Sequence, residues 1–270
     1  MKILFIGYSN LVKKRILPIL DRLDDIDSLC VAKSGNRSWD NILELTSKPI
    51  ELFDNYEKAI RNSKSSIAYI STTNDSHFIW AKATLNAGIH TIIDKPATIS
   101  LSETKELLKI ARDKKLLLSE STVYLYHPQF NSLREIMKKN KASPKLLTAH
   151  FSFPPLDTDN FRYRKDLGGG AFLDTSPYAV SLGRYFFNSL PDQSYYIENE
   201  SSDDGIDISY SLLLKYSNGR ALIGHFGFNT EYVNRLNILG DKISIDVDRI
   251  FTIPDLMTNT INVKAANESY

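Results

Sequence analysis

Two side chains capable of acid–base chemistry stand four residues apart near the middle of the chain. Asp174 and Tyr178 lie in the stretch AFLDTSPYAV, which directly follows three glycines at 168–170. The stretch is predicted to be helical, and a spacing of four residues places both side chains on one helix face. A phenol there can act as a general acid. The alternatives are that Tyr178 lines a core edge and that Asp174 is a polar group near the helix end.

A third candidate, Lys95, belongs to the tripeptide Asp94-Lys95-Pro96, which follows the apolar run HTII. Proline fixes its own φ and favours an extended conformation in the residues before it. The carboxyl ends of strands are where open α/β sheets bind ligands. A partly desolvated lysine at such a position can donate a hydrogen bond or a proton to a carbonyl oxygen. The alternative is a solvated lysine in a loop.

The N-terminal stretch KILFIGYSNLVKKRILPIL is typical of a strand that turns into a helix. Dinucleotide-binding turns usually read G-x-G-x-x-G, whereas this chain has Gly7, Ser9 and Val12 at the three positions. Gly7 retains the tight turn, and the Ser9 hydroxyl can donate to a phosphate oxygen. Backbone N–H groups at the helix start, from about Asn10 and Leu11, favour anions. An ordinary strand–helix turn remains the alternative.

The second strand ends in VAKSGNRS. NAD-specific folds usually place an acidic residue here for the ribose 2′-hydroxyl. This chain has Ser34, Asn36 and Arg37 instead, and an arginine fork suits a 2′-phosphate. We therefore expect NADP, with NAD possible. A solvated basic turn is the alternative.

The elements that position these residues alternate over the first 120 residues. Apolar runs alternate with helix-period stretches at 10–22, 40–47, 55–62, 76–88 and 101–115. Ser100 with Glu103 has capping-box spacing, and Gly88 is a helix stop signal. This order predicts a doubly wound parallel sheet. Residues 1–122 are therefore assigned to a cofactor-binding Rossmann domain.

The pattern changes after residue 122. Helices are predicted near 128–140 and 171–188, with a strand at 146–153 and a polar loop between. From 195 onward the alternation is of strand type, with turns at 217–219 and 240–242. Residues 123–270 are therefore predicted to form an α+β domain with a largely antiparallel open sheet, which would bind substrate and form the dimer.

Three segments together carry a family resemblance: STTNDSH at 71–77, Asp94-Lys95-Pro96, and DNFRYRKDLGGGAFLDTSPY at 159–178. In this combination the chain resembles the Gfo/Idh/MocA family of nicotinamide-dependent sugar oxidoreductases over nearly its whole length. The stretch from 151 to 187 looks most like members that reduce a 3-keto group on nucleotide-linked deoxysugars.

The resemblance implies roles for individual residues. Lys95 matches the lysine of the family's E-K-P motif beside the nicotinamide, with Asp94 in place of glutamate. The face carrying Asp174 and Tyr178 would look toward sugar and nicotinamide. Asp174 would orient a sugar hydroxyl, and Tyr178 or Lys95 would protonate the new alkoxide. The cofactor set that we infer comprises Gly7, Ser9, Asn10, Leu11, Ser34, Arg37, Thr72, Asn74, His77, Asp94, Lys95 and Arg162. Arg162 is equally a candidate for a substrate phosphate, and His77 equally a satisfied histidine at a helix start.

Composition excludes several other classes. A formal net charge of +1 gives no strong field for nucleic acid or anionic lipid. The single cysteine, Cys30, allows no internal disulfide, and no His/Cys cluster suggests a metal. The sequence shows no signal-peptide pattern and no apolar run of the ~20 residues that span a bilayer. We expect a cytoplasmic protein whose partners are a sugar or nucleotide-sugar substrate and further copies of the chain, in a homodimer or a higher oligomer.

Two departures from the family pattern keep other functions open. One is the altered glycine turn, and the other is that members usually continue several dozen residues past a point like Tyr270. A shortened C-terminal sheet, or a partner over its open face, is expected. A dehydrogenase of a free sugar or polyol and a catalytically degenerate nucleotide-binding relative are the alternatives.

Overall fold

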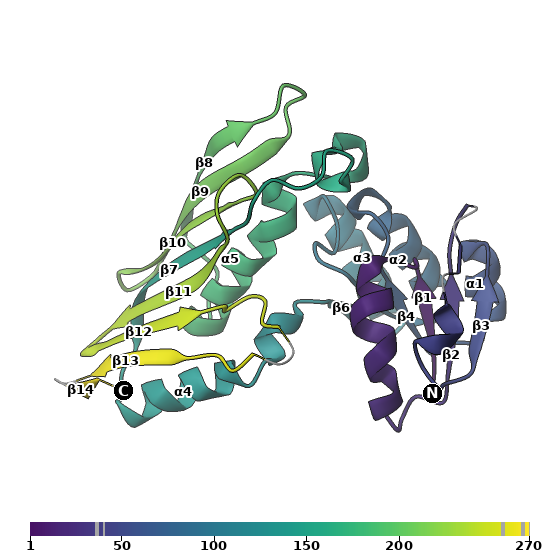
Figure 1. Cartoon of the computed structure of the whole chain (residues 1–270), viewed down its shortest axis with the longest axis horizontal. Coiled ribbons are helices and arrows are strands. Elements are labelled where there is room, and N and C mark those ends of the chain that lie inside the picture. The colour runs from purple at the N-terminus through teal and green to yellow at the C-terminus, as the bar shows by residue number, and fades with distance from the viewer. Residues whose placement is uncertain (36–37, 40, 255–256, 266–267, 270) are drawn as a thin grey trace. The chain divides into compact units, whose positions relative to one another are not determined.

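Two compact units make up the chain (Figure 1). The computed structural model describes residues 1–35, 38–39, 41–254, 257–265 and 268–269. The first unit contains Met1–Ser121 together with the short segment Asp166–Gly168, and the second contains Thr122–Lys165 and Gly169–Tyr270. A piece of the triple-glycine loop thus belongs to the first unit, although it lies far along the chain.

Six parallel strands form the sheet of the first unit, in the order β3-β2-β1-β4-β5-β6. They are β1 (Lys2–Ile6), β2 (Ser28–Ala32), β3 (Ile50–Phe53), β4 (Ile67–Ile70), β5 (His90–Ile93) and β6 (Leu118–Glu120). The order reverses between β1 and β4, and doubly wound sheets bind ligands at the carboxyl ends of the strands at this reversal. The predicted parallel doubly wound fold is confirmed.

Both faces of this sheet are covered, which explains why its strands read as continuous apolar runs. Leu4 and Ile6 of β1 face α1 (Tyr56–Asn62), α2 (His77–Asn86) and α3 (Leu101–Asp113). Phe5, between them, packs on the opposite face with the first helical segment. That alternation places the carboxyl end of β1 between two packed layers.

The first helical segment differs from the regular helix predicted over 10–22. It consists of a π-helical turn, η1 (Val12–Ile16), followed by a 3-10 helix, η2 (Leu17–Arg22). Val12 is fully buried where the usual motif has a glycine, and Pro18 has no N–H to continue an α-helical ladder. The bulky residue and the proline together account for the irregular winding.

Two further expectations for the first unit were wrong. The helix expected over 40–47 is the short η3 (Ile42–Glu44), and β3 was not expected at all. β3 is an edge strand of four residues with Glu51 and Leu52 exposed, so it lacks both the length and the alternation that signal a strand. Another short helix, η4 (Asn74–Ser76), precedes α2.

An eight-stranded sheet forms the second unit, in the order β14-β13-β12-β11-β7-β10-β9-β8. Its strands are β7 (Pro144–Ser152), β8 (Gln193–Ser201), β9 (Asp207–Tyr216), β10 (Arg220–Gly227), β11 (Val233–Gly240), β12 (Ile243–Asp248), β13 (Ile261–Ala265) and β14 (Glu268–Ser269). β7 and β10 are parallel neighbours, and every other pairing is antiparallel. The predicted largely antiparallel second sheet is confirmed.

Helix α5 (Ala171–Phe187) packs on one face of this sheet, against β9, β10 and β7 (Figure 1). The remaining helices of the second half are α4 (Gln129–Lys139), η5 (Val123–Tyr126), η6 (Phe161–Tyr163) and η7 (Lys165–Leu167). The other face carries exposed apolar side chains, among them Tyr195, Ile197 and Ile223. In the described ranges, no helix is long and apolar enough to cross a membrane.

A row of two histidines and an arginine crosses the open face of the second sheet, and it predicts that the stability of the fold depends on pH. His150 on β7 pairs in register with His225 on β10 and with Arg235 on β11. Burial, followed by the charges of His225 and Arg235, lowers the pKa of His150. A base whose folded pKa lies below its unfolded value stabilises the fold above the unfolded pKa, and this contribution disappears as the pH falls through the folded pKa.

We therefore expect the melting temperature to fall as the pH is lowered from about 7.5 to about 5, around the usual histidine pKa of ~6.5. A His150→Gln variant should show a shallower decline, because the group that must be protonated is gone. Calorimetry at several pH values measures this. Superimposable pH profiles for the two proteins would contradict the assignment.

Candidate functional site

The carboxyl end of β1 forms the tight turn that the sequence predicted at Gly7. This glycine has φ +104°, and an added Cβ would overlap the Ser71 carbonyl oxygen and lie 2.7 Å from the carbonyl carbon. The Gly7 N–H donates to the Ala32 carbonyl of β2, 3.0 Å away. A side chain at position 7 would therefore force apart β1 and β4 at the reversal of strand order.

The Ser9 hydroxyl contacts Ser71, which is distant in sequence and was not predicted as its partner. Its hydroxyl lies 2.7 Å from the hydroxyl of Ser71, and it accepts a hydrogen bond of 3.2 Å from the Val12 N–H. Ser9 thus fastens the turn to β4 and covers one amide of the following helix. Asn10 and Leu11 are exposed at the start of that helix.

The residues after β2 are partly outside the described structure. Arg37 lies outside the described residues, as does Asn36, whereas Ser34 is exposed. Lys33 is buried, with its ammonium 4.4 Å from the ring centre of Trp39 and 3.7 Å from an Asp54 carboxylate oxygen. No acidic side chain takes the expected place at the end of β2 in the described part of this turn.

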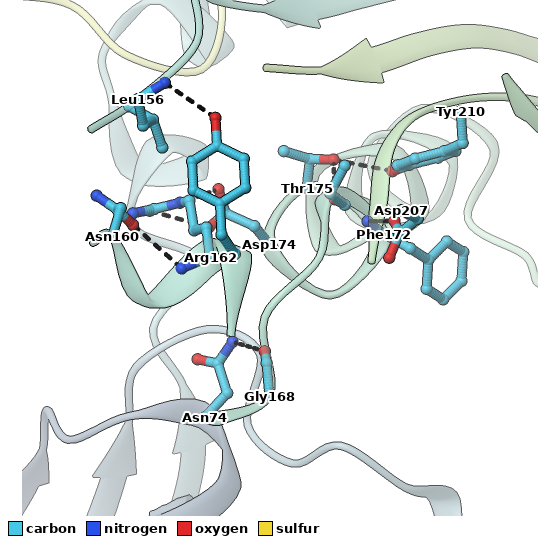
Figure 2. Close-up of polar contacts among 12 residues, drawn as sticks. Asn74, Leu156, Asn160, Arg162, Gly168, Phe172, Asp174, Thr175, Asp207 and Tyr210 are labelled. Carbon is cyan, nitrogen blue, oxygen red and sulfur yellow. Dashed lines mark hydrogen bonds and ion pairs between the residues drawn. The ribbon is translucent and has the colours of Figure 1, made fainter. Parts of the chain in front are cut away.

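The turn after β4 contacts the triple-glycine loop, which is distant in sequence. The Asn74 amide donates to the Gly168 carbonyl at 2.8 Å, and Asn74 is buried (Figure 2). A Cβ on Gly168 would lie 2.8 Å from the Cβ of Asn74. The contact with Asn74 therefore requires a glycine at the first position of the triple-glycine motif. Thr72, at the start of the turn, accepts a hydrogen bond from the Ser76 hydroxyl.

Lys95 lies just past the carboxyl end of β5, as predicted, and is half-buried. The Asp94 carboxylate accepts a 2.9 Å hydrogen bond from the Lys95 N–H. Pro96 is buried and follows a cis peptide bond, and the next N–H, of Ala97, donates to the Glu120 carboxylate at 2.8 Å. Carboxylates from two strand ends thus hold the backbone on both sides of Pro96.

Asp174 and Arg162 form an ion pair within the second unit (Figure 2). Arg162 Nε is 2.7 Å and its Nη2 3.2 Å from the two carboxylate oxygens, which is bidentate geometry. Asp174 is buried, and the side chain of Arg162 is 26% exposed. The sequence placed both residues in the site, but it gave no sign that they bind each other.

The carboxylate of Asp207, on β9, accepts a hydrogen bond from the backbone at the N-terminus of helix α5. The Phe172 N–H donates to Asp207 Oδ2 at 2.5 Å, and burial raises the pKa of Asp207 despite this hydrogen bond. An anion at a helix N-terminus is stabilised by the amides and the helix dipole. Asp207 was missed from the sequence, because only the strand register brings β9 to this helix end.

Tyr178 is half-buried on α5 and belongs to an aromatic cluster. Its ring centre lies 4.8 Å from that of Phe251 and 5.2 Å from that of Phe151. Tyr124 donates from its hydroxyl to the Tyr178 carbonyl at 3.2 Å. The ring is therefore oriented by packing, and its face of the helix also carries Asp174.

A dinucleotide fits the arrangement at the carboxyl edge of the first sheet. The fit rests on the close approach of Gly7 to β4 at the reversal of strand order, which leaves backbone rather than side chain at the turn. Among the described residues, no group of three or more His, Cys, Asp or Glu side chains is placed to hold a metal ion.

Known proteins match the chain in both halves. The model of the oxidoreductase family with an NAD-binding Rossmann fold, GFO/IDH/MocA, matches residues 1–122, and the model of a GFO/IDH/MocA C-terminal domain matches residues 131–246.

Curated relatives include a dTDP-3,4-didehydro-2,6-dideoxy-alpha-D-glucose 3-reductase of Saccharopolyspora spinosa. It is 27% identical over 250 residues, which cover 92% of this chain and 75% of the relative. A D-xylose 1-dehydrogenase (NADP(+)) of Haloferax volcanii is 30% identical over 179 residues, covering 66% of this chain and 55% of the relative.

The fold also matches solved structures. A 3-ketoreductase from Actinomadura kijaniata, crystallised with NADP and TDP-benzene, superimposes with a TM-score of 0.88 at 22% identity, covering 100% of this chain and 83% of that one. With both family models matched in sequence and the same two-sheet fold, the chain belongs to the Gfo/Idh/MocA family of oxidoreductases.

Proposed function

We propose that this protein uses NADPH to reduce a keto group on a nucleotide-linked deoxyhexose. The observation that carries the proposal is the retention of Lys95, Asp174 and Tyr178 together with the Gly7 turn, in a chain similar over 92% of its length to a dTDP-sugar 3-reductase. The cofactor, when bound, supplies the hydride, and the protein supplies position and electrostatics.

In this proposal, Tyr178 or Lys95 gives a proton to the oxygen of the reduced carbonyl. The Lys95 ammonium also stabilises negative charge on that oxygen. Asp174, held by Arg162, orients a sugar hydroxyl, so Arg162 acts through Asp174. Except for His77, which is buried with both ring nitrogens beside backbone carbonyls, the residues at the carboxyl edge of the first sheet that were inferred from the sequence to bind cofactor remain the proposed cofactor site.

Turnover assays test the proposal directly. With a dTDP-linked 3-keto-deoxyhexose, we expect NADPH to be consumed with a higher kcat/KM than NADH, because Ser34 and the basic turn after β2 suit a 2′-phosphate. Binding of NADPH without turnover of any nucleotide-linked keto sugar would instead indicate a catalytically degenerate, nucleotide-binding relative. A preference for NADH would contradict the cofactor assignment.

A second candidate function is oxidation of a free sugar. The similarity to a D-xylose 1-dehydrogenase (NADP(+)) over 66% of this chain favours it. Oxidation of D-xylose by NADP+, with no reduction of nucleotide-linked keto sugars, would select this alternative.

We also propose that the chain forms a homodimer through the open face of the second sheet. Tyr195, Ile197 and Ile223 are 52%, 64% and 45% exposed on its strands, and contiguous exposed apolar surface favours association. The mass of the protein in solution, measured by light scattering, tests this.

A further inference from the structure

His77, the first residue of α2, connects the two loops that follow β4 and β5. It is 1% exposed. Its Nδ1 lies 2.8 Å from the Pro96 carbonyl oxygen, and its Nε2 lies 3.2 Å from the Thr72 carbonyl oxygen. Both ring nitrogens therefore contact the backbone, and the ring is shielded from solvent.

Pro96 directly follows Lys95 in the same loop, so a contact to the Pro96 carbonyl holds the backbone next to Lys95. A neutral imidazole has a single N–H, so only one of the two carbonyl oxygens can accept a hydrogen bond from it, and we assign this bond to the shorter contact, with Nδ1 donating to Pro96. Asp94 and Glu120 hold the amides of Lys95 and Ala97, as described above. His77 adds a contact to the carbonyl that stands between those amides, from a helix rather than from a strand end.

We infer that His77 is a positioning residue: it fixes the Pro96 carbonyl and thereby the backbone from which Lys95 reaches the keto oxygen. The inference rests on the proposed function, in which Lys95 acts on that oxygen. Because His77 is buried and both of its ring nitrogens lie beside backbone carbonyls, we assign it this role instead of the direct cofactor contact that was one of its two sequence-based interpretations. Displacement of a reacting group by about 1 Å can cost about 100-fold in rate.

A general structural role for His77 makes a different prediction, and the chain offers a matched control. Thr84 lies on the same helix, is fully buried, and its hydroxyl is 2.8 Å from the hydroxyl of Thr91 on β5. The pairs His77–Pro96 and Thr84–Thr91 therefore link α2 to the same strand segment at opposite ends. Only the first of them lies beside Lys95.

Three variants separate the two roles: His77→Leu, His77→Asn and Thr84→Ala. The Asn amide places an N–H donor where His Nδ1 stands. We expect His77→Leu to lower kcat about 10- to 100-fold, with KM for NADPH within about twofold of wild type, and His77→Asn to recover most of the loss. Thr84→Ala should lower the melting temperature about as much as His77→Leu does, but it should leave kcat unchanged.

Hydrogen–deuterium exchange of the apo protein gives a readout that needs no turnover. Peptides containing the Lys95 and Ala97 amides should exchange faster in His77→Leu than in wild type or Thr84→Ala. Unchanged exchange in these peptides, or equal loss of kcat in His77→Leu and Thr84→Ala, would overturn the inference. If wild type turns over no keto sugar, the proposed function fails, and the exchange result alone decides whether His77 holds the loop.

Discussion

Replacing Lys95 by Met and Tyr178 by Phe together is expected to lower kcat by about 10³-fold or more while NADPH still binds. General acid catalysis contributes about 10²–10⁴-fold, and a single charge-stabilising donor contributes about 10²–10³-fold. Both substitutions conserve shape, because Met retains the length of the lysine and Phe retains the ring that packs on Phe151 and Phe251. NADPH fluorescence titration and steady-state kinetics measure the two quantities separately.

The control is a double variant that removes the same two groups elsewhere, Lys82→Met with Tyr185→Phe. Lys82 pairs with Glu106 on the surface of the first unit, and Tyr185 donates its hydroxyl to the Phe130 carbonyl from helix α5. This variant should keep the wild-type kcat. Full activity in the Lys95 and Tyr178 double variant would show that neither group acts in the reaction.

A Gly7→Ala variant is expected to lose NADPH affinity by about tenfold or more, since the pyrophosphate needs close backbone approach at this turn. The new Cβ overlaps the Ser71 carbonyl, and φ at this position is +104°. Strain of this kind costs about 1–3 kcal/mol in the free energy of unfolding. Isothermal titration with NADPH and urea unfolding report the two effects.

Gly88→Ala separates loss of affinity from general destabilisation. Gly88 also has a positive φ, +83°, but an added Cβ there meets nothing within 4 Å. It should lower the free energy of unfolding by about 1–2 kcal/mol and leave NADPH affinity unchanged. If Gly7→Ala binds NADPH as tightly as Gly88→Ala does, the turn after β1 is not the pyrophosphate site.

Local sequence signals were sufficient to predict features that depend on a single helix or strand. Ser100 caps α3 by accepting from the Glu103 N–H, and Gly88 ends α2 with a positive φ, as their types and spacing predicted. The position of Lys95 after β5 follows from an apolar run that ends at Asp94-Lys95-Pro96. These features depend on residues within a few positions of one another.

Contacts between distant segments could not be predicted. The Arg162–Asp174 pair, the Asp207 carboxylate at the start of α5 and the Asn74–Gly168 hydrogen bond each join residues separated by 12 to 94 positions. Their formation depends on strand register and loop path, which residue type and periodicity do not encode. For Asp174, nothing in the sequence indicated that arginine N–H groups contact both carboxylate oxygens.

Transfer of deuterium from NADPH labelled on the transferable C4 position tests whether the protein reduces the keto group by hydride transfer. With a dTDP-linked 3-keto-deoxyhexose, we expect a single deuterium on C3 of the sugar product, observed by NMR and mass spectrometry, in an amount equal to the NADPH consumed. A product without deuterium at C3, or consumption of NADPH with the keto sugar left unchanged, would contradict it.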